Sequence, residues 1–131
     1  MVDSKRVKDW IERAKRDLKD AEILLNNGGS YGAVGFLVQQ CIEKVFKAFL
    51  LSTRKELLKT HSLTYLNKLC SDYDSDFEQY RDDCSEIEDY YIESRYPGDL
   101  PMGIDVHDVK KALKRAENIL DFTTQKIFQE K

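Results

Sequence analysis

Five polar side chains with helical spacing are the residues of this sequence best suited to chemistry. They are Gln39, Gln40, Glu43, Lys44 and Lys47, and most of the positions between and around them are apolar. On an α-helix, which turns about 100° per residue, all five fall within an arc of about 140° and form one polar stripe. Lysine ammonium groups bind phosphate, and a glutamine amide both donates and accepts hydrogen bonds. One interpretation is therefore a phosphate-binding groove lined by Gln40, Lys44 and Lys47.

A simpler interpretation of the stripe is an ordinary exposed helix face. Glu43 precedes Lys47 by four residues. This is the favourable order for an ion pair, which contributes ~0.3–0.5 kcal/mol on an exposed helix. The spacing is compatible with both interpretations.

The second candidate is the segment ESRYPGDLP, residues 93–101, which contains both prolines of the chain. Its Pro-Gly pair is enough to stop a helix. The segment also holds Arg95 and Tyr96, and Tyr91 lies on the helix before it. Arg95 would stabilise the end of that helix by ~0.3–1 kcal/mol, or it would bind phosphate while Tyr91 or Tyr96 stacks on a base. Because a hinge needs only the proline and the glycine, we expect a ligand-binding edge.

The histidines and cysteines show no metal-site spacing. The chain has two histidines, His61 and His107, and three cysteines, Cys41, Cys70 and Cys84. It contains no Cys-x-x-Cys, no His-Glu-x-x-His and no glycine-rich phosphate loop, so we expect neither a metal nor another cofactor. The odd number of cysteines favours buried free thiols over disulfides. His61, at an expected helix start, is predicted to cap or to pack.

Apolar residues recur at intervals of three and four through nearly the whole chain, which is the period of α-helices. Gly28 is suited to ending a helix, and Ser30 and Asp105 are suited to capping the helices that follow them. The pattern predicts an all-α fold, an antiparallel up-and-down bundle of four to five helices in a single domain of residues 1–131. The expected helices cover residues 4–27, 31–52, 62–71, 77–95 and 106–129.

The acidic residues are concentrated in one segment. The formal net charge is −3, but residues 71–94 contain ten aspartates and glutamates and a single arginine. This composition predicts a solvated helix face, with Glu86 and Asp89 pointing to water. The acidic balance also disfavours non-specific nucleic-acid binding, which needs a basic surface.

The hydropathy pattern contains no membrane signal. No apolar run approaches the ~20 residues of a membrane-spanning helix. The N-terminal residues MVDSKRVKDW lack the apolar stretch of a signal peptide. We therefore expect a cytoplasmic protein without membrane contact.

Four strings of the sequence together resemble a known family. They are WIERAKRDLKDAEILL at 10–25, GAVGFLVQQCIEKVFKAFL at 32–50, THSL at 60–63 and SRYP at 94–97. They resemble the HEPN domain, the higher eukaryote and prokaryote nucleotide-binding family. The resemblance implies a small helical bundle, usually a homodimer, that binds a nucleotide or a protein partner. Members are often encoded beside a minimal nucleotidyltransferase, so the resemblance also implies that enzyme as the partner in a toxin–antitoxin-like pair.

The resemblance raises the alternative of a metal-independent ribonuclease. Nuclease members carry an arginine followed by a histidine four to six residues later, before the last helix. Arg95 is in that place, but residues 100–102 are Leu-Pro-Met and His107 is twelve positions away. Arg54 and His61 have a permitted spacing in a part of the chain where the family does not place the motif.

RNA cleavage needs a group that takes the 2′-hydroxyl proton as well as a cation that stabilises the phosphorane. With the histidine missing from its place, we expect no catalytic residues. Two alternatives remain beside the nucleotide-binding module. One is a ribonuclease that uses Arg95 with His107, and the other is a ligand-free scaffold whose acidic helix docks a basic partner.

Overall fold

The computed structural model describes residues 4–54, 58–94 and 105–129, and these ranges contain helices and no strand. The α-helices are α1 (Ser4–Asn26), α2 (Tyr31–Arg54), α3 (Leu63–Tyr73), α4 (Arg81–Ser94) and α5 (Val106–Phe128), with a 3₁₀ turn, η1 (Ser75–Tyr80), between α3 and α4. The predicted all-α fold is confirmed. None of the described helices is long and apolar enough to cross a membrane.

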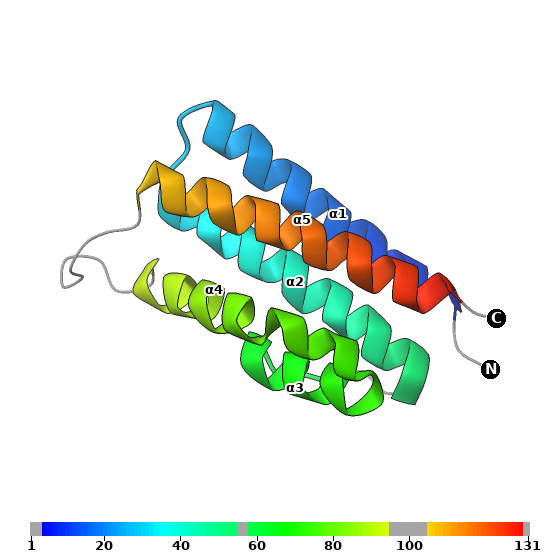
Figure 1. Ribbon diagram of the computed structural model, residues 1–131. Helices are drawn as coiled ribbons and strands as arrows, with labels where there is room; N and C mark the ends of the chain where they lie inside the picture. The colour runs from blue at the N-terminus through cyan, green and yellow to red at the C-terminus, as the bar shows by residue number, and fades with distance from the viewer. Residues whose placement is uncertain (1–3, 55–57, 95–104, 130–131) are drawn as a thin grey trace.

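The helices form an antiparallel bundle around α2. Successive long helices α1, α2, α4 and α5 run in alternating directions, and the short α3 packs beside α4 (Figure 1). Helix α2 contacts α1, α3, α4 and α5. Its central place agrees with its wide apolar surface, because Val38, Ile42, Val45, Phe46 and most of its other apolar residues are buried.

Aromatic packing joins the second half of the chain to α2. Phe77, on η1, is fully buried. Its ring lies 5.9 Å from that of Phe46, 4.6 Å from that of Phe49 and 5.1 Å from that of Phe122 on α5. Burial of a phenylalanine side chain contributes ~1.5–3 kcal/mol, so Phe77 fixes η1, and with it the start of α4, against the bundle.

Local signals in the sequence explain where the helices begin and end. Gly28 ends α1 with a φ of 84°, a backbone conformation that glycine adopts readily. The Ser30 hydroxyl accepts a hydrogen bond from the Ala33 N–H at 3.2 Å. Asp105 and Asp108 form a capping box at the start of α5. The caps predicted at Ser30 and Asp105 are confirmed.

The predicted fourth helix, 77–95, begins too early. The Asp74 side chain accepts from the Asp76 N–H and starts the 3₁₀ turn, so α4 begins only at Arg81. The apolar spacing continues through the turn, and periodicity alone did not reveal the change of helix type.

All three cysteines are free and buried, as predicted. Burial raises the pKa of the Cys41 thiol to about 12 and raises the pKa values of Cys70 and Cys84 as well. Because the thiolate is the reactive form, these side chains act as small apolar core residues.

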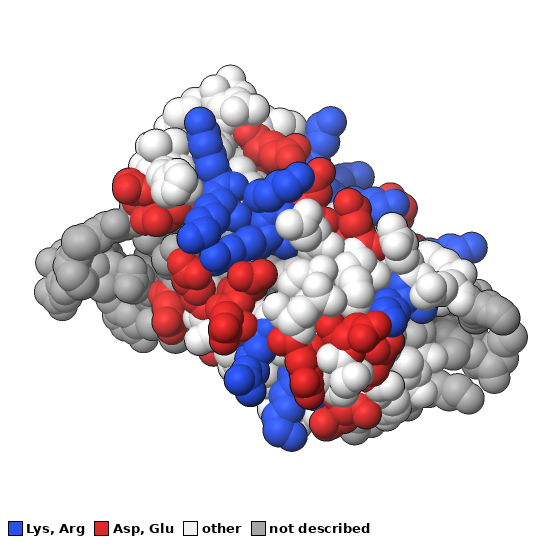
Figure 2. Space-filling model, in the orientation of Figure 1, with Lys and Arg blue, Asp and Glu red and all other residues white. Residues whose placement is uncertain are grey.

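Helix α5 neutralises part of the acidic segment. The Arg115 guanidinium bridges two carboxylates of α4, with Nε 3.2 Å from Asp83 Oδ1 and Nη1 2.5 Å from Glu86 Oε1. The Glu86 side chain stays 40% exposed, so it faces water as expected but is also paired with α5. A row of Asp and Glu side chains lies directly beside the basic side chains of α5 (Figure 2).

A second charge cluster fixes η1 to the end of α5. Lys126 Nζ lies 2.7 Å from Asp74 Oδ2 and 2.8 Å from Asp76 Oδ2. It also lies 5.5 Å from the centre of the Phe122 ring. The hydrogen bond from Lys126 holds the pKa of Asp74 below its ordinary value of 3.8, and the two aspartates raise the pKa of Lys126 above 10.5.

The Lys126 cluster predicts a pH window for stability. Its contribution is present between about pH 4 and pH 10.5, is lost on acidification as Asp74 protonates, and is lost on alkalinisation as Lys126 deprotonates. We expect Lys126→Met to lower Tm by roughly 1–4 °C at pH 7, because such partly exposed pairs contribute ~0.2–1 kcal/mol. Lys68→Met, which removes an exposed pair with Asp72, is the control. A Tm difference for Lys126→Met that is the same at about pH 3 and about pH 7 would contradict this account.

Candidate functional site

Most side chains of the polar stripe of α2 bind one carboxylate, that of Glu43. Glu43 Oε2 lies 2.9 Å from Lys47 Nζ and 2.9 Å from His61 Nδ1. Glu43 Oε1 accepts hydrogen bonds from Gln39 Nε2 at 3.4 Å and Gln40 Nε2 at 3.3 Å. We call these five residues the Glu43 cluster. Its carboxylate has partners on both oxygens, so the cluster is a satisfied network and not an open ligand site.

The cluster is buried on its helix side. The Glu43 and Lys47 side chains are 5% and 6% exposed, and Gln39 is fully buried. The expected ion pair between Glu43 and Lys47 is therefore present, but the expectation that it is exposed is wrong. Helix α2 is too central in the bundle for its polar stripe to face water. The geometry also leaves Lys47 little access to a phosphate, whereas Gln40 stays half-buried at the edge of the cluster.

His61, just before the start of α3, is the member of the Glu43 cluster that lies outside α2. Its imidazole side chain is 75% exposed, and its backbone carbonyl accepts a hydrogen bond from Gln39 Nε2 at 3.0 Å. The neighbouring Ser62 caps α3. His61 thus neither packs in the core nor supplies the cap with its own side chain. It ties the start of α3 to α2, and since Glu43 and His61 are 18 residues apart in sequence, no local pattern predicted the contact.

Lys44 lies at the edge of the polar stripe, next to α1. Its Nζ is 2.7 Å from Asp17 Oδ2, and both side chains are largely buried. A surface hollow of about 460 Å³ lies beside this pair and is lined also by Arg13 and Arg16. Lys44 is therefore accessible at the edge of a hollow, but its charge is already paired.

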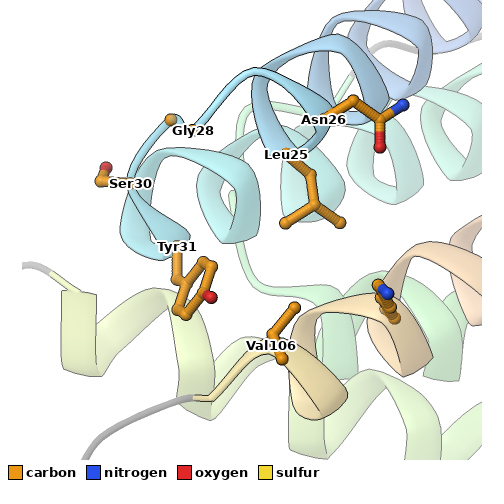
Figure 3. Close-up of a pocket in the computed structure, with 8 residues that line it drawn as sticks. Leu25, Asn26, Gly28, Ser30, Tyr31 and Val106 are labelled. Atoms are coloured by element: carbon orange, nitrogen blue, oxygen red, sulfur yellow. The ribbon is translucent and has the colours of Figure 1, made fainter.

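A larger hollow lies at one end of the bundle, where the α1–α2 turn approaches the start of α5. It has a volume of about 580 Å³, and its lining includes Asn26, Ser30, Tyr31, Val106 and Lys110. Tyr31 and Val106 face each other across it (Figure 3). We call it the end hollow. No sequence pattern indicated this hollow, because Tyr31 and Lys110 belong to helices far apart in the chain.

The end hollow is lined by both polar and apolar groups. Tyr31 is 38% exposed and offers a ring face, and Lys110 is an exposed cation. Asn26 and Ser30 add polar groups to the apolar carbons of Val106. Its volume is within the ~300–1,000 Å³ of ligand pockets. Within the described ranges no group of three or more histidines, cysteines or carboxylates is placed to hold a metal ion.

Comparison with known proteins decides the family. The model of the HEPN domain matches residues 7–127. The chain belongs to the HEPN-domain family. None of the curated proteins matches it in sequence.

Two solved structures have the same fold as this HEPN domain. The protein TT1696 from Thermus thermophilus is 29% identical with a TM-score of 0.78, and the match covers 92% of this chain and 98% of that protein. ST0689, described as an archaeal HEPN homologue, is 26% identical with a TM-score of 0.68, and the match covers 92% and 97% of the two chains. The resemblance noted in the sequence is thereby confirmed.

Several candidate residues of the HEPN motif region are not placed. Arg95 and Tyr96 lie outside the described residues, and Tyr91 is on α4 but its side chain is also outside them. His107 is exposed in the first turn of α5. The end of α4 and the start of α5 lie at the same end of the bundle as the α1–α2 turn (Figure 1). The ribonuclease alternative, in which Arg95 would act with His107, therefore lies partly outside the described residues.

Removal of the Lys47 charge tests the Glu43 cluster. Lys47→Met should lower the free energy of unfolding by about 3–5 kcal/mol, because Glu43 would be left as an uncompensated charge in a buried position. Lys15→Met, which removes an exposed lysine paired with Glu12, should change it by less than ~0.5 kcal/mol. Urea unfolding measures both. Equal effects of the two substitutions would show that the Glu43 cluster does not stabilise the fold.

Proposed function

We propose that this HEPN domain is a non-catalytic binding module for a nucleotide-like phosphorylated ligand, and that it acts as a homodimer beside a minimal nucleotidyltransferase. One observation carries the ligand proposal: the end hollow combines an exposed tyrosine ring with an exposed lysine in a space of about 580 Å³. The family match supports the wider setting of the proposal.

Each part of the end hollow suits one part of a nucleotide. The Tyr31 ring provides a face on which a base stacks, an interaction that tolerates any base. The Lys110 ammonium provides a charge-assisted contact for phosphate. Asn26 and Ser30 provide hydrogen bonds for a ribose. Arg95, Tyr91 and Tyr96 stay candidate ligand-binding residues in this proposal.

The residues on α2 have different parts in the proposal. Lys47 is occupied by Glu43 and serves the fold. Lys44 stays a secondary candidate, because a ligand at its hollow would have to compete with Asp17 at 2.7 Å. Gln40 is available only through the part of its amide that the Glu43 cluster leaves exposed.

The homodimer is proposed from apolar surface left on the long helices. Large apolar side chains remain exposed on several of them, and these include Ile23, Phe36 and Phe128. Such residues mark protein contacts when they gather on one surface. A partner nucleotidyltransferase in a toxin–antitoxin-like pair would use the surface that the dimer leaves free.

Binding of AMP tests the ligand proposal. Tyr31→Ala and Lys110→Gln should each weaken AMP binding by roughly ten-fold, the scale of a lost stacking or charge-assisted contact. Tyr65→Ala and Lys68→Gln are matched controls, because both residues are exposed on α3, away from the end hollow. Calorimetric titration measures the four affinities. If the hollow variants bind AMP as the controls do, the end hollow is not the site.

The absence of the motif histidine predicts that the purified protein does not cut single-stranded RNA, with or without divalent metal. A fluorescent RNA substrate and gel analysis measure this. The ribonuclease alternative would be revived by cleavage that persists in Lys44→Ala and is lost in both Arg95→Ala and His107→Ala.

Light scattering tests the homodimer. We expect a molar mass of twice the 15.3 kDa of one chain at micromolar concentration, because the exposed apolar side chains would be covered in the dimer. A mass of a single chain under these conditions would leave the HEPN domain monomeric and would contradict the proposal.

A further inference from the structure

A row of exposed lysines continues from the end hollow along α5. Lys110 lines the hollow. Lys111 follows it, and Lys114 lies one turn further, about 6 Å along the helix axis. Lys110 and Lys111 are exposed, Lys114 is 70% exposed at its side chain, and Lys and Arg side chains gather over this half of α5 in Figure 2. We call Lys110, Lys111 and Lys114 the lysine row.

The lysine row differs from the other cations of α5, which serve the fold. Arg115 binds the carboxylates of α4, and Lys126 binds those of η1. Within the described ranges, Lys110 and Lys111 make no ion pair. Lys114 makes one with Glu117 at 3.5 Å, between side chains that are 70% and 49% exposed, which is a weak interaction.

The arrangement of the lysine row is locally unfavourable. Like charges three and four residues apart on a helix repel each other. The α4 carboxylates Asp83 and Glu86 are bound by Arg115. On α5 itself the opposite charges three residues from the row are Asp108 and Glu117, and the Glu117 pair with Lys114 is exposed and weak. Three neighbouring cations with one weak ion pair among them, the first of which lines the hollow, form a region of positive potential that favours an anion.

We propose that the lysine row binds a chain of linked phosphates that extends from the end hollow, so that the preferred ligand is an oligophosphate. This rests on the proposed function for the position of the site. A single phosphate at Lys110 would leave Lys111 and Lys114 unused, whereas a chain of three phosphates has enough charge and length to contact all three. Lysines suit this task, because each is a point charge on a flexible stem and requires no fixed geometry.

Two classes of ligand contain such a chain of linked phosphates: nucleoside triphosphates and inorganic oligophosphates. The experiment compares AMP, ATP and inorganic tripolyphosphate by calorimetry at one ionic strength, with the full chain, its Lys111→Gln and Lys114→Gln variants, and Lys68→Gln as the control. We expect ATP to bind at least ~10-fold more tightly than AMP. Each row variant should lower ATP affinity by ~3–10-fold and leave AMP affinity unchanged.

The outcomes separate this inference from the proposed function. Equal affinities for AMP and ATP, both weakened by Tyr31→Ala, would overturn the proposal that the lysine row binds linked phosphates. The proposed nucleotide site at the end hollow would stand. Tripolyphosphate bound as tightly as ATP, with no effect of Tyr31→Ala on ATP affinity, would support binding of oligophosphate by the lysine row. The same result would show that the nucleoside is not recognised at the end hollow. No binding of any of the three compounds would overturn both.

Discussion

A buried carboxylate at the centre of α2 is the constraint on which the rest of the structure depends. Burial of a charge is costly unless it is paired and hydrogen-bonded, and Glu43 meets this requirement with Lys47, His61 and two glutamines. One of these partners comes from outside α2, so the need to satisfy Glu43 fixes where the chain returns after the second helix. His61 leads directly to the Ser62 cap of α3. Glu88 of α4 then accepts hydrogen bonds from the Ser62 hydroxyl and the Thr64 N–H. The carboxylate therefore positions α3 and, through it, one face of α4.

Ion pairs join α5 to α4 and η1, and they determine which cations are left available for function. The acidic segment, with ten acidic residues and one arginine, would repel itself as an isolated surface. Arg115 and Lys126 of α5 relieve part of this repulsion and join α5 to α4 and η1. On α2, Lys44 and Lys47 are likewise paired within the fold. The lysines of α5 beside the end hollow have no such structural task, which is why the proposed site lies at the end of the bundle.

Periodicity and caps were enough to predict the all-α bundle and most helix ends. They failed at η1, because Phe77 and Tyr80 are three residues apart, an interval that suits a 3₁₀ turn as well as an α-helix. The candidate site was harder to predict. Spacing correctly grouped Gln39, Gln40, Glu43 and Lys47, but it could not show their burial, which depends on helices distant in sequence. Tyr31 and Lys110 carried no local signal at all, since their meeting is a product of the tertiary fold. The predicted site residues Arg95 and Tyr96 lie outside the described residues.

The central claim is that the polar stripe of α2 serves the fold while the ligand binds at the end of the bundle. Backbone amide chemical shifts measured by two-dimensional NMR during titration with ATP test it most directly, because they report on residues throughout the chain in one experiment. The account predicts that the largest shift changes fall on residues 28–31 and 106–114. Changes centred on residues 39–47 and 61–64 would contradict it and would return the ligand site to the Glu43 cluster.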